Sequence, residues 1–107
     1  MPPCSKQEIR SKLRSLPGWR SGKSHLSKTF TFSGFSECIA FVDLIAQRAT
    51  AVDHHPDIDI RFAKATLRLS THDEGGVTGK DFLLAADIDD VYAGFSQHLP
   101  GGSRPIG

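Results

Sequence analysis

The chain has 107 residues, of which 38% are hydrophobic and 23% are charged, a composition that fits one domain with a modest core. Its 13 basic and 12 acidic residues give a net charge of +1 without a long run of one sign, so we expect no direct contact with nucleic acid. The two cysteines, Cys4 and Cys38, define no disulfide framework, and no apolar run forms a membrane span or a signal peptide, so we expect a cytoplasmic protein without membrane contact.

The first predicted element is a helix at about 6–16. Ser5 followed three residues later by Glu8 fits a capping box, and apolar residues recur at helical spacing up to the Pro17-Gly18 stop. Trp19-Arg20 is then predicted as a short strand, and a Ser-Gly-Lys turn leads to the next strand.

Alternating side chains predict a strand from His25 to Phe32 that pairs with the first strand as a hairpin. Lys28 interrupts its apolar face, which places that end near an edge or a polar site.

The next helix is predicted at about 36–52, with Ser33 or Ser36 as its N-cap. Its apolar stripe consists of Cys38, Phe41, Val42, Ile45, Ala46, Ala49 and Val52.

The stretch that follows this helix changes its apolar face, because apolar residues occupy even positions up to Ile60 and odd positions from Ala65. One continuous strand cannot change face in this way without a bulge or a turn. Two strands are therefore predicted, at 57–61 and 64–71, with the bend at Phe62-Ala63. Phe-Ala is poor turn chemistry, so the change of face carries this prediction.

A loop with two glycines leads to the last helix, predicted at about 79–97 with Thr78 as its cap and Asp81 at its third position. The element order is thus α-ββ-α-ββ-α. Two hairpins form a four-stranded antiparallel sheet with helices packed on one face, since their apolar stripes have nothing else to cover them. The predicted fold class is α+β, in a single domain over all 107 residues with loose termini at 1–5 and 100–107.

Three of the five histidines lie in two short motifs, Asp53-His54-His55-Pro56 and Ser70-Thr71-His72-Asp73. Imidazole titrates near pH ~6.5, so a histidine cluster suits acid–base catalysis. The proline pushes His55 toward extended geometry, in which neighbouring side chains point to opposite sides. His54 and His55 should therefore have different roles.

Other interpretations of these residues remain open. Each histidine could be an ordinary loop or strand-end residue, and three histidines could bind zinc. We expect no metal, because the adjacent pair should diverge and no His-x-x-x-His or Cys-x-x-Cys spacing is present. Asp81 is explained by helix capping alone, and Trp19 is either part of the core or a flat wall for a planar ligand, with the core favoured.

Several motifs together resemble those of the pterin-4a-carbinolamine dehydratases, over roughly residues 6–97. They are Leu16-Pro17-Gly18-Trp19, Phe30-Thr31-Phe32 with Phe35, Asp53-His54-His55-Pro56-Asp57-Ile58, Ser70-Thr71-His72-Asp73, and Gly76-Val77-Thr78 before Asp81-Phe82. The spacing of the three histidines, and the aspartate nine residues after His72, are similar to that family's signature.

This resemblance implies an enzyme that converts 4a-hydroxytetrahydropterin to quinonoid dihydropterin and water, without a cofactor or metal, in the recycling of tetrahydrobiopterin. His54 and His72 match the family's acid–base histidines, and His55 matches a histidine that mainly holds the pterin. The residues expected to bind the substrate or support its site are His55, Trp19, Asp53, Thr71 and Asp81.

Thr50 departs from the family pattern, which has a glutamate or another charged residue four positions before the first histidine. A threonine carries no charge toward the imidazole. Some family members also act as dimerisation partners of a transcription factor, so the alternative function is a non-enzymatic protein-interaction module. Family members form dimers and tetramers, and open sheet edges invite pairing, so we expect a homodimer or homotetramer.

Overall fold

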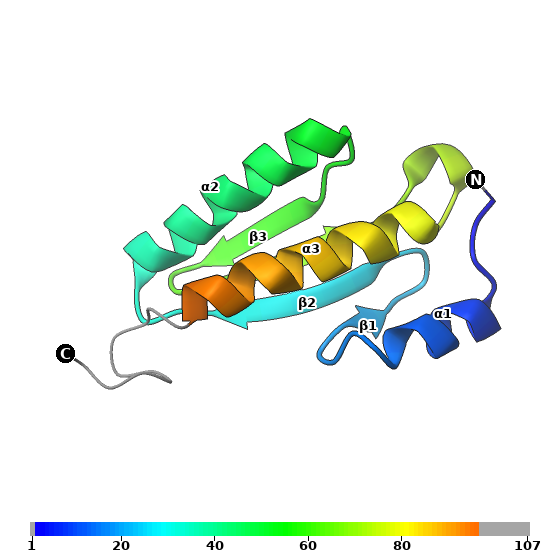
Figure 1. The fold of residues 1–107 in the computed structure, drawn as a ribbon, viewed down its shortest axis with the longest axis horizontal. Helices are drawn as coiled ribbons and strands as arrows, with labels where there is room; N and C mark the ends of the chain where they lie inside the picture. The colour runs from blue at the N-terminus through cyan, green and yellow to red at the C-terminus, as the bar shows by residue number, and fades with distance from the viewer. Residues whose placement is uncertain (1, 97–107) are drawn as a thin grey trace.

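The computed structural model describes residues 2–96. In chain order the elements are α1 (Lys6–Leu13), β1 (Arg20–Ser21), β2 (Leu26–Thr31), α2 (Phe35–Val52), β3 (Asp57–Arg61), β4 (Lys64–Leu69), the 3₁₀ turn η1 (His72–Glu74) and α3 (Gly79–Ser96) (Figure 1). All strand pairs are antiparallel, and the sheet order β1-β2-β4-β3 joins two hairpins through β2 and β4. The predicted α-ββ-α-ββ-α order and α+β class are confirmed.

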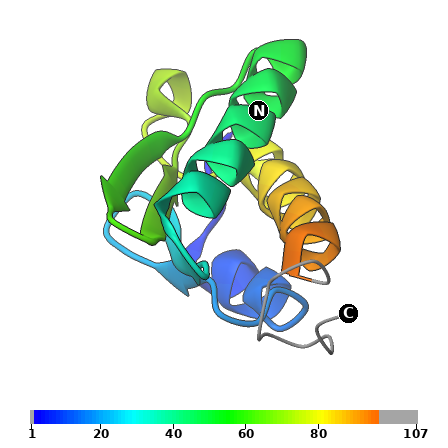
Figure 2. The ribbon, with the colours of Figure 1, turned by 90° about the vertical axis from the view of Figure 1, so that its left-hand side faces the viewer.

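The helices lie on one face of the sheet, as the end view in Figure 2 shows. The apolar side chains that the two central strands turn toward the helices are fully or almost fully buried: Leu26, Phe30, Ala65, Leu67 and Leu69. Burying a large apolar side chain contributes roughly 1.5–3 kcal/mol, so this layer supplies much of the folding free energy. No helix within residues 2–96 is long and apolar enough to cross a membrane.

Helix α1 begins as predicted but ends early. The Glu8 N–H donates to the Ser5 hydroxyl at 3.1 Å and the Ser5 N–H donates to the Glu8 carboxylate at 2.8 Å, which confirms the capping box. The helix ends at Leu13 rather than residue 16, because the next three N–H groups bond to carbonyls three residues back in a tighter turn. The Cys4 N–H donates to the Val77 carbonyl at 2.6 Å, which links the segment before α1 to the loop after η1.

Helix α2 begins at Phe35, and its N-cap is Gly34, without a side-chain cap. The predicted serine caps, Ser33 and Ser36, were wrong. A Cβ on Gly34 would lie 2.9 Å from the Glu37 carboxylate, which folds back over the first turn where the helix dipole favours negative charge. The residues of the predicted stripe that are buried are Cys38, Phe41, Ile45 and Ala49, whereas Ala46 and Val52 are exposed.

Strand β4 ends at Leu69, two residues before the predicted end of the segment 64–71. The Ser70 hydroxyl donates to the Ser24 carbonyl at 2.8 Å, so the chain leaves the strand at this residue. Thr71 then forms an isolated bridge with Gly76, its N–H donating to the Gly76 carbonyl at 2.9 Å. This bridge closes the loop that carries η1.

The turn between β3 and β4 consists of Phe62 and Ala63, where the change of apolar face predicted it. Phe62 has a φ of 51° and a side chain that is 74% exposed. This left-handed backbone is uncommon for a bulky residue, because its Cβ approaches the following carbonyl oxygen.

We expect Phe62→Asn to stabilise the fold by about 1 kcal/mol, since asparagine tolerates the left-handed conformation and little buried area is lost. A gain of this size raises the Tm of a small domain by about 4–8 °C, which thermal unfolding followed by circular dichroism measures. Phe62→Ala is the control, because it removes the same ring but keeps an ordinary side chain at positive φ. Equal Tm values for the two variants would show that the turn is not strained.

Candidate active site

His54 directly follows the left-handed turn at Asp53 that ends helix α2. Asp53 has φ 51° and ψ 45°, and its N–H donates to the carbonyls of Ala49 and Thr50. The His54 N–H donates to the Ala49 carbonyl at 3.1 Å, which completes the cap. Aspartate is one of the few residues that adopt this conformation readily, so the identity of residue 53 is explained by the turn. Its carboxylate is exposed beside His54 in the chain.

Asp81, in the first turn of α3, holds the imidazole of His54. The distance from His54 Nε2 to Asp81 Oδ1 is 2.6 Å, the His54 side chain is 13% exposed and the Asp81 side chain is fully buried. The dipole of α3 also favours a negative charge at this position. The carboxylate that faces His54 therefore comes from α3, and the exposed Thr50 has no role in this contact.

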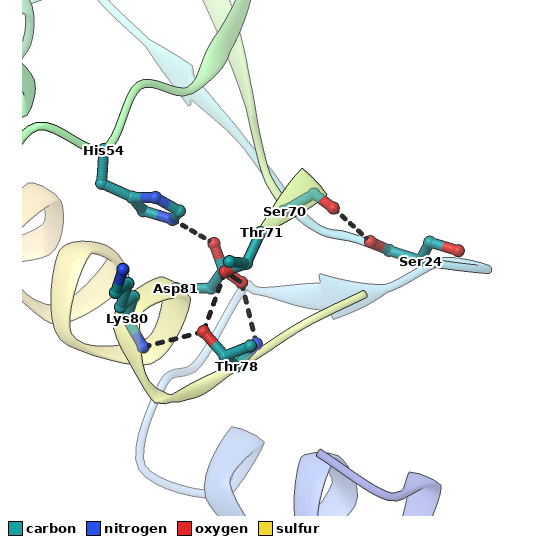
Figure 3. Close-up of polar contacts among 7 residues, drawn as sticks. All are labelled: Ser24, His54, Ser70, Thr71, Thr78, Lys80 and Asp81. Atoms are coloured by element: carbon teal, nitrogen blue, oxygen red, sulfur yellow. Dashed lines mark hydrogen bonds and ion pairs between the residues drawn. The ribbon is translucent and has the colours of Figure 1, made fainter. Parts of the chain in front are cut away.

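Two threonines hold the other oxygen of the same carboxylate (Figure 3). Asp81 Oδ2 accepts from the Thr71 hydroxyl and from the Thr78 N–H, each at 2.9 Å. The Thr71 and Thr78 hydroxyls are 2.8 Å apart, and the Lys80 N–H donates to the Thr78 hydroxyl at 3.2 Å. Thr78 thus caps α3 as predicted. Its N–H also helps to orient the Asp81 carboxylate that binds His54.

The donor and the acceptor of each hydrogen bond in this network follow from the chemistry of the groups that cannot donate. A carboxylate only accepts, so Thr71 must donate its hydroxyl proton to Asp81 and accept the proton of the Thr78 hydroxyl. For the same reason Nε2 of His54 must carry the proton that it shares with Asp81. In the neutral imidazole this leaves Nδ1 without a proton, so Nδ1 is the basic atom of His54.

The other two histidines lie at the ends of neighbouring segments. His55 is exposed and precedes Pro56 and β3, and His72 is exposed and begins η1 directly after Thr71. The structure thus brings together His54, Thr71 and Asp81, with His72 attached to Thr71 through the chain. Within residues 2–96, no three His, Cys, Asp or Glu side chains are grouped so that they could hold a metal ion.

Trp19 occupies a separate place in the core. It is 5% exposed, packs edge-on against Phe30, and its Nε1–H donates to both carboxylate oxygens of Asp89 at 3.0 and 3.1 Å. Lys28 Nζ donates to Asp89 at 2.9 Å. Lys28 therefore lies at a polar site, as its interruption of the apolar face of β2 predicted. Asp89 lies eight residues after Asp81, about 12 Å along α3. The core interpretation of Trp19 is confirmed, and a contact with substrate stays a prediction.

His54 also lines a cavity of about 270 Å³ between the end of α2 and the start of α3. Val52, Leu83 and Leu84 form its apolar walls, and Lys80 and Asp87 complete the lining. Val52 is 62% exposed and Leu83 73% exposed, so the rim is apolar as well. A small concave site with apolar walls and a few polar groups is typical of places that bind small organic molecules.

The fold and this site define a class: a small α+β domain with a carboxylate-held histidine at the meeting point of two helix ends. A sequence model of the family described as "Pterin 4 alpha carbinolamine dehydratase" matches residues 2–91. The chain belongs to this family.

Individual relatives agree with this assignment. A protein of Roseiflexus castenholzii is 54% identical over 84 residues, which cover 78% of this chain and 90% of the relative. One of Chloroflexus aurantiacus is 46% identical over 91 residues, covering 85% and 98%. Both bear the name "Putative pterin-4-alpha-carbinolamine dehydratase". The crystal structure of a "transcriptional coactivator/pterin dehydratase" from Brucella melitensis matches with a TM-score of 0.80 at 28% identity, covering 83% of this chain and 97% of that one.

Proposed function

We propose that this chain catalyses the dehydration of a 4a-hydroxytetrahydropterin to the quinonoid dihydropterin, in the cytoplasmic recycling of tetrahydrobiopterin. The observation that supports this best is the directed hydrogen-bond network that leaves Nδ1 of His54 basic, in a chain of the dehydratase family. The reaction requires one proton donor and one proton acceptor that work near neutral pH, and histidine supplies both. The proposal involves no cofactor and no metal.

The chemistry consists of two proton transfers around one bond cleavage. An acid protonates the hydroxyl on C4a, which then leaves as water. The lone pair of N5 forms the new C4a–N5 double bond as the C4a–O bond breaks, and a base takes the proton of N5. One proton is delivered and one is taken, so the reaction is balanced without any other reactant.

We assign the base to His54 and the acid to His72. When Nδ1 of His54 takes the N5 proton, the imidazolium is stabilised by the Asp81 carboxylate that accepts from Nε2. His72 is exposed and follows Thr71 directly, so an incoming substrate can reach its imidazole. Substrates with the opposite hydroxyl stereochemistry would exchange the two roles.

The remaining residues of the site form two groups, one exposed to solvent and one buried. His55 and Asp53 are exposed next to His54, and we propose that they contact the pterin directly. Thr71 is 6% exposed and Asp81 is fully buried, so these two residues act on the substrate through His54.

A direct assay tests this function. The purified chain should accelerate the decay of enzymatically generated 4a-hydroxytetrahydropterin, followed by its ultraviolet absorbance, above the spontaneous rate. The double variant His54→Ala, His72→Ala is the negative control, because it differs from the unmodified chain only in lacking these two imidazoles. An unmodified, folded chain that gives only the spontaneous rate would refute the proposal.

His55→Ala should raise KM with little change in kcat, because it removes a group that binds the pterin in both the ground state and the transition state. Steady-state kinetics measure this split, and His54→Ala is the comparison, since its main effect is expected on kcat. A large fall in kcat for His55→Ala at unchanged KM would instead assign proton transfer to His55.

A second function, as a protein-interaction module, is supported by two observations. The Brucella melitensis relative is described as a "transcriptional coactivator/pterin dehydratase". Large apolar side chains are also exposed on the helices of this chain, and such surface marks interaction sites when it is contiguous. They are Phe35, Ile39, Leu44 and Val52 of α2 and Leu83 of α3.

We propose that this chain forms a homodimer or homotetramer. Strand β3 is an open edge of the sheet, and Ile58 on it is 36% exposed, so a second copy can pair there. Sedimentation velocity at micromolar concentration should show a dimer or a larger assembly, and Ile58→Lys should reduce it by placing a charge on the edge. A monomer for the unmodified chain would contradict this proposal.

A further inference from the structure

A second cleft, of about 540 Å³, is not lined by His54, His55 or His72. Three segments enclose it: the N-terminal segment with α1, the turn between β1 and β2, and residues 75–77 of the loop after η1. The Cys4 N–H bond to the Val77 carbonyl ties the first of these segments to the third. The cleft shares no lining residue with the cavity beside His54.

Among residues 2–96, three cations line this cleft and no acidic residue does. Lys6 and Arg10 lie one turn apart on the same face of α1, and Lys23 comes from the opposite turn. None of the three forms an ion pair or a side-chain hydrogen bond with any residue of the described range 2–96. Burial raises the pKa of the Cys4 thiol, so this residue adds no negative charge to the lining at neutral pH.

Of the chain around the cleft, the part that contains α1 and the β1–β2 turn is basic, whereas Asp73 and Glu74 directly precede the third segment. Residues 6–23 contain six of the 13 basic residues and only one of the 12 acidic ones, Glu8. The carboxylate of Glu8 is already bonded to the Ser5 N–H in the capping box. A concave surface with charges of one sign focuses the electrostatic potential and attracts ions of the opposite sign.

The rest of the lining suits an organic body attached to the anionic groups. Ser21 and Ser24 offer hydroxyls, and Ile9, Leu13 and Val77 form an apolar wall. The volume falls within the range of about 300–1,000 Å³ that is usual for sites of small organic ligands.

We propose that this cleft binds a small organic anion that carries several phosphate groups. Arginine and lysine are the side chains that recognise phosphate best, through charge-assisted hydrogen bonds. The three cations line one concavity, whereas a nucleic-acid duplex needs basic residues spread along its length. The site does not depend on the dehydratase activity, because it uses none of the histidines.

Titration calorimetry at low salt tests the proposal with three compounds: adenosine triphosphate, inorganic tripolyphosphate and adenosine. We expect saturable binding of the nucleotide, weaker binding of tripolyphosphate because it lacks the organic body, and no binding of adenosine. Binding should weaken as salt is raised, since surface charges are screened. In nuclear magnetic resonance spectra the amide signals of Gly75 and Gly76 should shift with the nucleotide.

Charge reversal locates the site. Lys6→Glu, Arg10→Glu and Lys23→Glu should each weaken nucleotide binding by roughly tenfold or more, the equivalent of one charge-assisted hydrogen bond. Lys64→Glu is the matched control, because it makes the same change of charge on an exposed position of β4 outside the cleft. Circular dichroism of each variant confirms that it is folded.

Three outcomes would overturn the proposal. The first is no saturable binding by the unmodified chain. The second is equal weakening by Lys64→Glu and by the cleft variants, which would indicate a nonspecific effect of net charge. The third is a duplex oligonucleotide that binds far more tightly than the nucleotide and is lost in the same variants, which would assign this surface to nucleic acid.

Discussion

His54→Ala and His72→Ala should each lower kcat for pterin dehydration by roughly 10²–10⁴-fold, the usual contribution of a positioned acid or base. In the proposed mechanism His54 supplies the basic Nδ1 atom, and His72 supplies the acid for the leaving hydroxyl. KM should change less, because neither proton transfer contributes much to ground-state binding. Steady-state kinetics with the 4a-hydroxytetrahydropterin measure both constants.

His25→Ala provides the matched control for these two variants. His25 packs against Gly22 at the β1–β2 turn and is not part of the network around Asp81. Its replacement should leave kcat unchanged. If His54→Ala and His72→Ala also retain full activity while remaining folded, the catalytic assignment fails, and the protein-interaction function becomes the better explanation of the chain.

Asp81→Asn should lower kcat by roughly 10²–10⁴-fold while the protein stays folded, because it reverses the tautomer of His54. The amide oxygen of asparagine can still accept from Thr71 and from the Thr78 N–H. Its amide nitrogen then faces Nε2 of His54 and donates to it, so the ring proton moves to Nδ1. The atom that should take the N5 proton is then already protonated.

The controls for Asp81→Asn separate this effect from damage to the fold. Asp90→Asn makes the same change at an exposed position of α3 outside the network and should leave kcat unchanged. Asp81→Ala should in addition destabilise the fold by about 1–3 kcal/mol, because buried donors lose their acceptor. Full activity of a folded Asp81→Asn protein would show that the carboxylate does not determine the proton position on His54.

The helices and strands were largely predictable, because their patterns depend on geometry within each element. The change of phase between Ile60 and Ala65 predicted the β3–β4 hairpin, since side chains of a strand alternate with a period of two whatever surrounds them. The ends of elements were less predictable. Ser70 leaves β4 to bond with Ser24, which is 46 residues earlier, and no local pattern indicates that contact.

The sequence by itself determined which groups can do chemistry: two adjacent histidines at a helix exit, a third at a strand end, and an aspartate at the third position of a helix. Capping explains Asp81 locally, because the spacing from Thr78 places its carboxylate at the Thr78 N–H. Only the tertiary structure decided that the other oxygen of that carboxylate meets His54, which is 27 residues away.

The placement of charge was also decided by the tertiary structure and not by the sequence pattern. A net charge of +1 with mixed signs indicates no special surface, yet folding brings Lys6, Arg10 and Lys23 around one cleft. Local sequence sets the conformation of each segment through steric and hydrogen-bonding preferences that act over a few residues. The packing of one segment on another is decided by the burial of apolar surface across the whole chain, and this packing sets the distances on which the site depends.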